Sequence, residues 1–391
     1  MLFTALSTVL LGFAATASPL RRQSSPNNTI STSSSLPFDP PTPPQLEFLY
    51  RAMVLCPADL LDQQVGPLGQ RKAIPIVGGN VTFASGMTGS IRNLGADEGL
   101  VDPQTGIFTA DTRYHAVLND GNSTWEGTDL FFQTSGPKQQ DGSLHLRIEI
   151  ETASRNYYYL NNVVAMGNLN NLGRDVNNVS TLRIDAYNMR PGTFIAFSWL
   201  NPADTSLFRI ADGGGVEQHG LSRSIKAPPG LNWLFTATFS IQPNLGPLTP
   251  GPYGIRLNIP IKGGQAVGPN GFAGQVLPVG ADWAVVDPTT GIGIADARWS
   301  IVLPASVGTN GTEKEIFVFT EGPSLPPPKG LNGAHLSIRL QTGFGHEWSW
   351  LNFVCAVGVL DILNPENTTL QTTVVDVFHL DGEWTSTLLA Q

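Results

Sequence analysis

Acidic and basic side chains occur at a two-residue spacing that could support acid–base chemistry. Asp111, Arg113 and His115 alternate along one segment, and Asp296 and Arg298 alternate along another. Residues two apart in a strand point to the same side. A carboxylate and a guanidinium there can hold each other and leave donors for a ligand oxygen. We predict catalytic roles for these five residues, with His115 as the main candidate because the second segment does not repeat it. A structural ion pair is the alternative, since both segments keep the Asp–Arg pair.

A second pattern alternates aromatic rings with an amide. Flat rings can stack on an unsaturated ligand while the amide orients it. Core packing explains the rings equally well, but it explains a repeated amide less well, because a buried amide needs hydrogen-bond partners. We predict that these residues bind substrate: Tyr157, Tyr159, Asn161, Trp283, Trp299, Trp348, Trp350 and Asn352.

Two further aspartates, Asp97 and Asp282, each follow Gly-Ala at an expected strand end. An Asp in a turn usually bonds its own backbone, so we expect turn caps, with a catalytic acid as the alternative. The sequence contains no G-x-S-x-G, P-loop, H-E-x-x-H or Rossmann motif,. The six histidines are scattered, and we predict no metal site and no cofactor.

These patterns recur because the chain contains an internal duplication. The run "GADEGLVDPQTGIFTADTRY" at 95–114 returns 185 positions later as "GADWAVVDPTTGIGIADARW" at 280–299. Similar runs follow in the same order, so that the copies span 46–189 and 231–380. A repeat of this length matches the usual size of an independent domain. We therefore predict two homologous domains.

Within each copy the apolar residues follow the pattern of half-buried strands. Leu144, Leu146, Ile148 and Ile150 alternate with polar residues, as a strand with one buried face requires. Many such short segments, separated by Gly/Pro turns and without helical periodicity, favour an all-β fold. A closed antiparallel barrel or a sandwich would satisfy the pattern, and closure removes exposed strand edges.

Several motifs in fixed order resemble a widespread bacterial and fungal family described only as domain of unknown function 3237. They are "GPLGQRKAIPIVGG" and "GPYGIRLNIPIKGG", followed by "GADW", "DARW" and the Tyr/Trp-x-Leu-Asn pattern. The resemblance covers nearly all of both repeats and implies two calycin-like antiparallel β-barrels in tandem. The first repeat departs from it at Glu98, where the second has Trp283.

Secreted fungal chains with this tandem layout resemble the hetero-Diels–Alder enzymes of tropolone sesquiterpenoid pathways. This resemblance implies a cofactor-free dehydration of a benzylic alcohol to an o-quinone methide, followed by cycloaddition to a humulene-type alkene. The partners would be an apolar polyketide and a terpene, held in one barrel or at the seam between the two. The alternatives are a secreted barrel that binds a small apolar ligand without turnover, and a surface glycoprotein with no small-molecule site.

Composition and targeting signals narrow the location and the partners. The net charge of −9 and the lack of a Lys/Arg cluster argue against nucleic acid,. We read residues 1–17 as a signal peptide, too short to span a membrane, followed by a Ser/Pro-rich tail (18–45). A partly packed linker (190–230) and a C-terminal tail (381–391) complete the chain. A secretory location is further suggested by six sequons at Asn27, Asn80, Asn122, Asn178, Asn310 and Asn367,.

The two cysteines, Cys56 and Cys355, occupy non-equivalent positions of the repeat. An oxidising compartment would permit a disulfide between the copies. Two buried free thiols are the alternative, and the sequence leaves both open.

Overall fold

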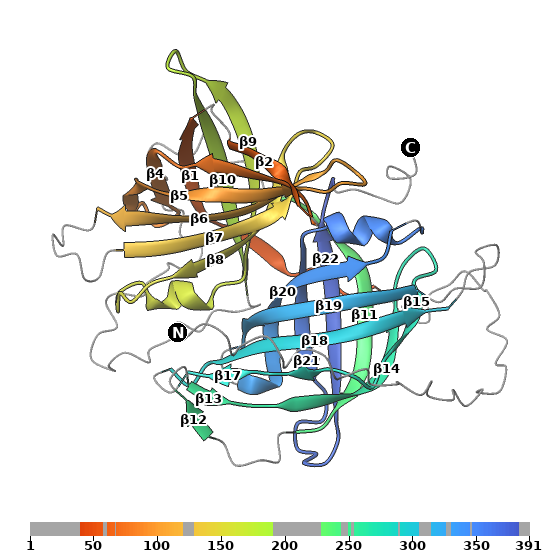
Figure 1. The fold of residues 1–391 in the computed structure, drawn as a ribbon. Coiled ribbons are helices and arrows are strands. Elements are labelled where there is room, and N and C mark those ends of the chain that lie inside the picture. Colours follow the sequence, from red (N-terminus) through yellow and green to blue (C-terminus); the bar gives the residue numbers. More distant parts are fainter. Residues whose placement is uncertain are drawn as a thin grey trace, which may run out of the picture. The chain divides into compact units, whose positions relative to one another are not determined.

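A computed structural model describes residues 40–57, 61–66, 68–119, 129–190, 228–243, 249–251, 254–287, 290–304, 314–325, 330–344 and 346–382 (Figure 1). The predicted signal peptide and most of both tails and of the linker lie outside this part of the chain. So do three sequons, at Asn27, Asn122 and Asn310. The other three asparagines, Asn80, Asn178 and Asn367, are exposed.

The first repeat forms a closed antiparallel barrel of eight strands. Around the ring the order is β5-β4-β1-β10-β9-β8-β7-β6, and β6 pairs with β5 to close it, while β2 and β3 extend the sheet from β5. Helix η1 (Tyr158–Asn162) precedes β9. The strands are β1 (Gln45–Pro57), β2 (Leu61–Gly66), β3 (Gly69–Pro75), β4 (Gly78–Phe83), β5 (Thr88–Val101), β6 (Phe108–Leu118), β7 (Asp129–Pro137), β8 (Leu144–Glu151), β9 (Ala165–Arg174) and β10 (Val179–Arg190).

The second repeat closes in the same way, in the order β18-β15-β14-β11-β22-β21-β20-β19 with β19 returning to β18. The predicted pair of antiparallel β-barrels is therefore confirmed. The elements are β11 (Leu231–Ile241), β12 (Thr249–Gly251), β13 (Gly254–Arg256), β14 (Ile259–Val267), β15 (Ala273–Val276), β16 (Ala281–Asp282), β17 (Val285–Val286), β18 (Gly293–Leu303), β19 (Lys314–Pro323), η2 (Gly330–Asn332), β20 (Gly333–Thr342), η3 (Ser349–Phe353), β21 (Ala356–Ile362) and β22 (Gln371–Leu380).

Large rings fill much of both interiors. In the first barrel Tyr114 stacks on Phe132 with centroids 5.0 Å apart, and Tyr50 meets the same ring edge-on at 5.3 Å. In the second barrel Phe235 stacks on Phe272, also at 5.0 Å. Apolar alternation along the strands places Tyr50, Tyr114 and Phe132 inside, while Phe272 comes from the turn before β15. Burial of these rings is the main stabilising contribution.

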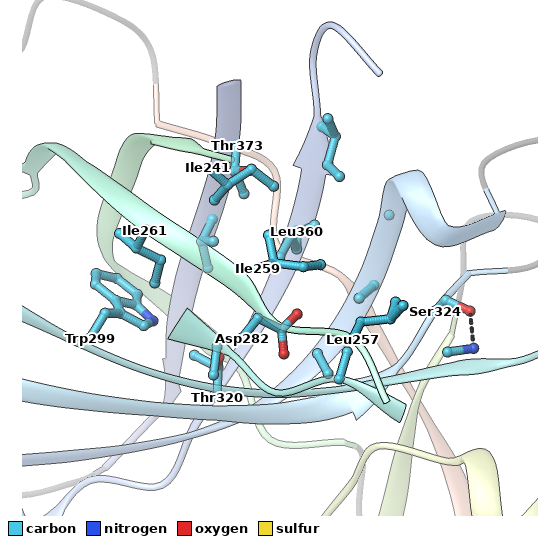
Figure 2. Close-up of a pocket in the computed structure, with 18 of the residues that line it drawn as sticks. Ile241, Leu257, Ile259, Ile261, Asp282, Trp299, Thr320, Ser324, Leu360 and Thr373 are labelled. Atoms are coloured by element: carbon cyan, nitrogen blue, oxygen red, sulfur yellow. Dashed lines mark hydrogen bonds between the residues drawn. The ribbon is translucent and has the colours of Figure 1, made fainter. Parts of the chain in front are cut away.

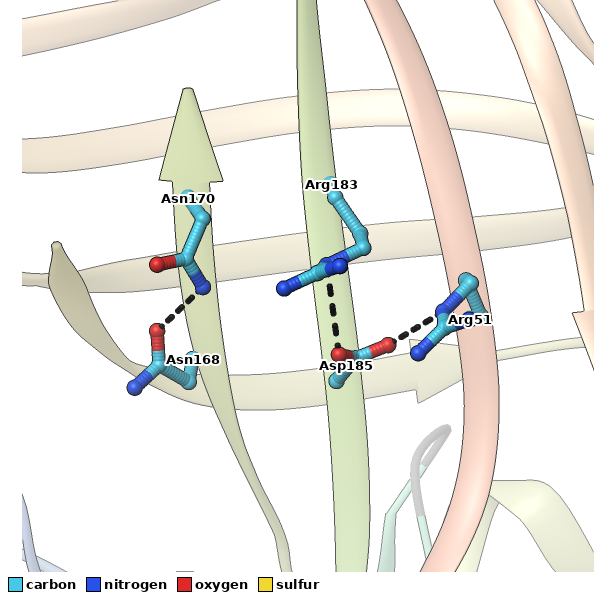
Figure 3. Close-up of polar contacts among 5 residues, drawn as sticks. All are labelled: Arg51, Asn168, Asn170, Arg183 and Asp185. Carbon is cyan, nitrogen blue, oxygen red and sulfur yellow. Dashed lines mark hydrogen bonds and ion pairs between the residues drawn. The ribbon is translucent and has the colours of Figure 1, made fainter. Parts of the chain in front are cut away.

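A polar contact joins the first and last strands of the first barrel, which are far apart in sequence. Arg51 on β1 is the register partner of Asp185 on β10, and its Nε donates to Oδ1 at 2.5 Å. Arg183 Nε lies 3.4 Å from the other carboxylate oxygen. Because Asp185 is almost fully buried, its pairing with guanidinium groups compensates for the loss of water. On the neighbouring strand β9, Asn170 Nδ2 donates to Asn168 Oδ1 at 2.8 Å (Figure 3).

The second barrel makes the corresponding contact without arginine. Thr236 on β11 is the register partner of Asp376 on β22, and its hydroxyl donates to Oδ1 at 2.6 Å. Each repeat thus fastens its first strand to its last through an equivalent aspartate, which helps the ring to close.

Both cysteines are buried, and neither is in a disulfide. Cys56 lies in the interior core of the first barrel, and Cys355 is buried with Val357 and Phe378. The disulfide alternative is therefore not realised, and the buried-thiol interpretation is correct. Among the described residues, no helix is long and apolar enough to cross a bilayer.

Candidate functional site

A cavity of about 100 Å³ lies inside the second barrel, toward the end at which β18, β20 and β22 begin (Figure 2). Most of its wall is apolar. Polar groups come from Asp282, Thr320, Ser324 and Thr373, and from the indole of Trp299. Asp282 and Ser324 are partly exposed, so the cavity reaches solvent on their side. The apolar lining includes Ile241, Leu257, Ile259, Ile261, Leu360 and Val375.

Small residues in the second repeat make room for this cavity. At the position of Gly293 the first repeat has Phe108, and at the position of Ala334 it has Leu144. The Phe108 ring lies over Gly99, since a Cβ added at Gly99 would be 2.2 Å from the ring. In the first barrel, side-chain volume therefore occupies space that the second barrel leaves free. The cavity depends on residues that the duplication did not keep.

The carboxyl of Asp282 is the acidic group of the cavity. Its Oδ1 accepts the backbone N–H of Asp296 at 2.9 Å, and Figure 2 shows the carboxyl among apolar side chains. Burial raises its pKa to about 6, although the Asp296 hydrogen bond acts in the opposite direction. Near neutral pH such a group can both give and accept a proton. The expected cap within its own turn is wrong, because the bonded N–H lies 14 residues further on, in β18.

Asp97 repeats this arrangement in the first barrel. Its Oδ1 accepts the N–H of Asp111 at 2.9 Å, and burial raises its pKa to about 6. The carboxyl position thus belongs to the fold that both repeats share. Asp282 lines a cavity at which the second repeat has Gly293 and Ala334 in place of Phe108 and Leu144.

Two tryptophans predicted to bind substrate lie near this carboxyl. Trp299 lines the cavity and packs against Phe239 with centroids 5.1 Å apart. Trp283 is 40% exposed, and the Arg298 guanidinium lies 5.8 Å from its ring centroid. Trp299 therefore faces the space in which a ligand would bind, and its role in binding stays a prediction.

The repeated amides have a structural partner instead of a ligand. Asn161 Oδ1 accepts the N–H of Thr152 at 2.7 Å, and its Nδ2 donates to the same residue's carbonyl at 3.0 Å. Asn352 does the same at Thr342, with distances of 2.8 and 3.1 Å. Each amide clamps a backbone segment, which explains why both copies keep it. Neither amide lines the cavity, and the hydrogen-bond partners that a repeated amide requires are backbone groups.

The four rings beside these amides also lie away from the cavity. The patterns fall at helices η1 and η3 and not on strands, so the assumed alternation does not apply. Tyr157 and Trp348 pack against the two barrel cores, Trp350 is buried, and Tyr159 is 47% exposed. Trp348 meets Phe272 edge-on at 5.0 Å, which makes it part of the ring packing.

The charged residues of β6 and β18 occupy the outer face. They alternate with core residues such as Tyr114, as predicted, but the shared side is the outer one. Arg113 bonds Asp111 at 3.0 Å, and Arg298 lies 3.1 Å from Asp296, with side chains 38–53% exposed. None of these residues lines the cavity. The ion pair that was the alternative interpretation is therefore present in both repeats.

His115 shares this outer position. Its Nδ1 lies 3.9 Å from Asp129 Oδ2, and its ring meets Phe131 edge-on at 5.3 Å. Within the described part of the chain, no three His, Cys, Asp or Glu side chains gather closely enough to hold a metal ion.

Comparison with known families agrees with the two-barrel architecture. The sequence model of the family described as "Protein of unknown function (DUF3237)" matches residues 44–189 and 229–380, which is more than half of the chain. The chain belongs to this family. No functionally curated protein shows significant similarity to it.

Solved structures similar to this DUF3237 chain correspond to one of its repeats. A Rhodopseudomonas palustris protein of unknown function is 20% identical with a TM-score of 0.31, and it aligns over 38% of this chain and 100% of its own. A Clostridium acetobutylicum protein of unknown function is 17% identical (TM-score 0.32; 38% and 99%). A protein described as an enzyme from Penicillium herquei is 21% identical (TM-score 0.30; 39% and 99%).

Proposed function

We propose that the second barrel binds a small aromatic alcohol and that Asp282 catalyses its dehydration. One observation carries this proposal: a partly buried carboxyl with a pKa of about 6 faces a mostly apolar cavity. Perturbed acids in apolar clefts are typical of general acid–base sites. Trp299 offers a flat surface on which an aromatic ring can stack.

The proton transfers balance on this single residue. For an ortho-hydroxybenzylic alcohol, protonated Asp282 donates its proton to the benzylic hydroxyl as the C–O bond breaks and water leaves. The resulting carboxylate accepts the phenolic proton, which regenerates the acid and yields an o-quinone methide. The net change is loss of one water molecule. The apolar wall slows the return of water to the intermediate.

The volume of the cavity suits one of the two reactants, so the other would approach from outside it. An engineered protein cavity of about 150 Å³ accommodates benzene, so about 100 Å³ suits one small ring or part of a larger molecule. A terpene alkene would approach from the solvent-facing side, beside Asp282 and Ser324. There it would add across the quinone methide, forming one C–C and one C–O bond in the proposed hetero-Diels–Alder step. Holding the quinone methide and the alkene in contact would accelerate the cycloaddition relative to the reaction in solution.

Turnover of 2-hydroxybenzyl alcohol with humulene tests this function. Pure full-length protein should consume the alcohol faster than buffer does and should give a stereochemically biased cycloadduct. Asp282→Asn should return the rate to the buffer level, because the amide cannot donate that proton. Asp97→Asn is the matched control and should keep the wild-type rate. A wild-type rate equal to buffer, or an active Asp282→Asn variant, would remove the proposal.

A second candidate function is binding of an apolar ligand without turnover. The mostly apolar wall of the cavity favours it. Native mass spectrometry of the purified protein should then show a bound small molecule, and aromatic alcohols should bind without being consumed.

We also propose passage through the secretory pathway. The apolar segment at Leu2–Ala15 and the exposed sequon asparagines Asn80, Asn178 and Asn367 support it. A mass decrease on treatment of the yeast-expressed protein with an endoglycosidase would be the expected result.

A further inference from the structure

One hydroxyl of the cavity has no hydrogen-bond partner. Thr373 lines the cavity and is 1% exposed. Its Oγ1 is fully buried, and no protein group within hydrogen-bond distance donates to it or accepts from it. Among the residues that line the cavity, Thr373 alone carries such a side-chain atom in the described part of the chain.

The neighbours of Thr373 are apolar. Its register partners are Phe239 on β11 and Ile362 on β21, and all three line the cavity. Val375 follows two residues later on the same inward face. Figure 2 shows Thr373 beside Ile241 and away from Asp282. The hydroxyl therefore lies in a second part of the cavity, apart from the acid.

The first repeat shows that the fold does not require this hydroxyl. Leu182 stands at the position of Thr373 and packs against the core of the first barrel. A buried hydroxyl without a partner destabilises the folded state, so an aliphatic residue would suit the free protein better. A ligand atom that bonds the hydroxyl would offset this cost.

We propose that Thr373 binds an oxygen substituent of the ligand, which makes it a specificity-determining residue of the second barrel. This inference rests on the site under the proposed function and defines its ligand class. The ligand is an aromatic alcohol that carries a further hydroxyl or carbonyl oxygen, distant from the group that reacts at Asp282. A hydroxyl side chain can donate to either kind of oxygen.

Matched ligands of nearly equal size test the inference by binding alone. The probes are 2-hydroxybenzyl alcohol derivatives that carry either a hydroxyl or a methyl group at ring position 4 or 5. Isothermal titration calorimetry measures their affinities for the full-length protein, for Thr373→Val and for Thr373→Ser. The same measurement on Asp282→Asn excludes any contribution from turnover.

Wild-type protein should prefer one hydroxyl derivative over its methyl counterpart by about fivefold, the usual effect of one hydrogen bond. Thr373→Val should abolish or reverse that preference, and Thr373→Ser should keep it. In the absence of ligand, Thr373→Val should raise Tm, because it removes an unsatisfied buried hydroxyl. Stability and affinity would then change in opposite directions, which a purely structural role would not produce.

Three results would overturn the inference: equal affinities for each hydroxyl and methyl pair, a preference that survives Thr373→Val, or no binding by any probe. Its failure is distinct from failure of the proposed function. Selective binding without turnover would leave Thr373 assigned and remove the dehydration. Turnover with equal affinities would support the dehydration and remove the assignment of Thr373.

Discussion

The Oδ1 atom of Asp282 accepts the backbone N–H of Asp296 at 2.9 Å, and the bond between Asp97 and Asp111 has the same length. Each bond holds a carboxyl in partly buried surroundings where its charged form is disfavoured. The fold therefore contains two acids with raised pKa values. Only local side-chain volume decides what lies in front of each.

The raised pKa values predict a dependence of stability on pH. The folded pKa of Asp282 is about 6, above the ordinary value of 3.8, so between these pH values the folded state binds more protons than the unfolded state. The free energy of unfolding should therefore fall as pH rises from about 4 to 6 and remain lower above that. Asp282→Asn should raise it by about 1–2 kcal/mol at pH 7, after allowance for partial exposure, and leave it unchanged at pH 4.

Urea unfolding followed by tryptophan fluorescence measures this effect, because five of the eight tryptophans lie within 231–380. Glu315→Gln, which removes a negative charge at an exposed position of β19, is the control for the loss of one charge from the second barrel. An Asp282→Asn variant with the wild-type pH profile would contradict the assignment.

Restoring the larger side chains of the first repeat should close the cavity. Gly293→Phe combined with Ala334→Leu places side-chain volume where the ligand would bind, so affinity for aromatic alcohols should fall by at least about tenfold. Calorimetric titration of the double variant checks this. Ala273→Leu, at an exposed position of β15, is the control and should bind as the wild type does. Unchanged affinity in the double variant would place the ligand elsewhere.

The amide clamps predict a loss of stability without a loss of affinity. Asn352→Ala removes hydrogen bonds to the backbone of Thr342 and Ser349 and should lower the free energy of unfolding by about 2–3 kcal/mol. Denaturant unfolding measures this change. At denaturant concentrations below the unfolding transition, the Kd for aromatic alcohols should stay within about twofold of the wild-type value. Weakened binding with unaltered stability would instead restore the pocket interpretation of Asn352.

Substitutions on the outer face should leave turnover intact. His115→Ser introduces the residue that the second repeat carries there, and Arg113→Gln breaks the pair with Asp111. Because these side chains are 35–48% exposed, each change should alter the free energy of unfolding by less than about 1 kcal/mol. Rates with 2-hydroxybenzyl alcohol and humulene should equal those of the wild type. A rate loss at constant stability would move the chemistry to this face.

The buried thiols should resist modification in the native protein. Burial raises the pKa of Cys56 to about 12, so almost no thiolate is present at pH 8. Iodoacetamide should label neither Cys56 nor Cys355 until denaturant is added, and then both. Mass spectrometry without reductant measures the labelling. A denatured protein that takes up label only after reduction would reveal a disulfide.

The sequence by itself determined the duplication, the all-β class and the barrel resemblance. Two-residue alternation reports that a segment is a strand with one buried face, and repetition of the same motifs shows that both halves share a fold. The contrast between Gly293 and Phe108 was also visible in the aligned repeats, and it was the available signal for the cavity.

Only the tertiary structure decided which side of each strand faces inward and where the space lies. Alternation places Asp111, Arg113 and His115 on one face of their strand but does not say which face is buried. Closure of the barrel turns that face toward solvent. The segments around Asn161 and Asn352 are short helices whose amides bond backbone 9 and 10 residues earlier in the chain, a contact that two-residue alternation does not predict. Asp282 acquires its raised pKa, and Thr373 its unpartnered hydroxyl, from neighbours on other strands, because burial is a property of the packed barrel.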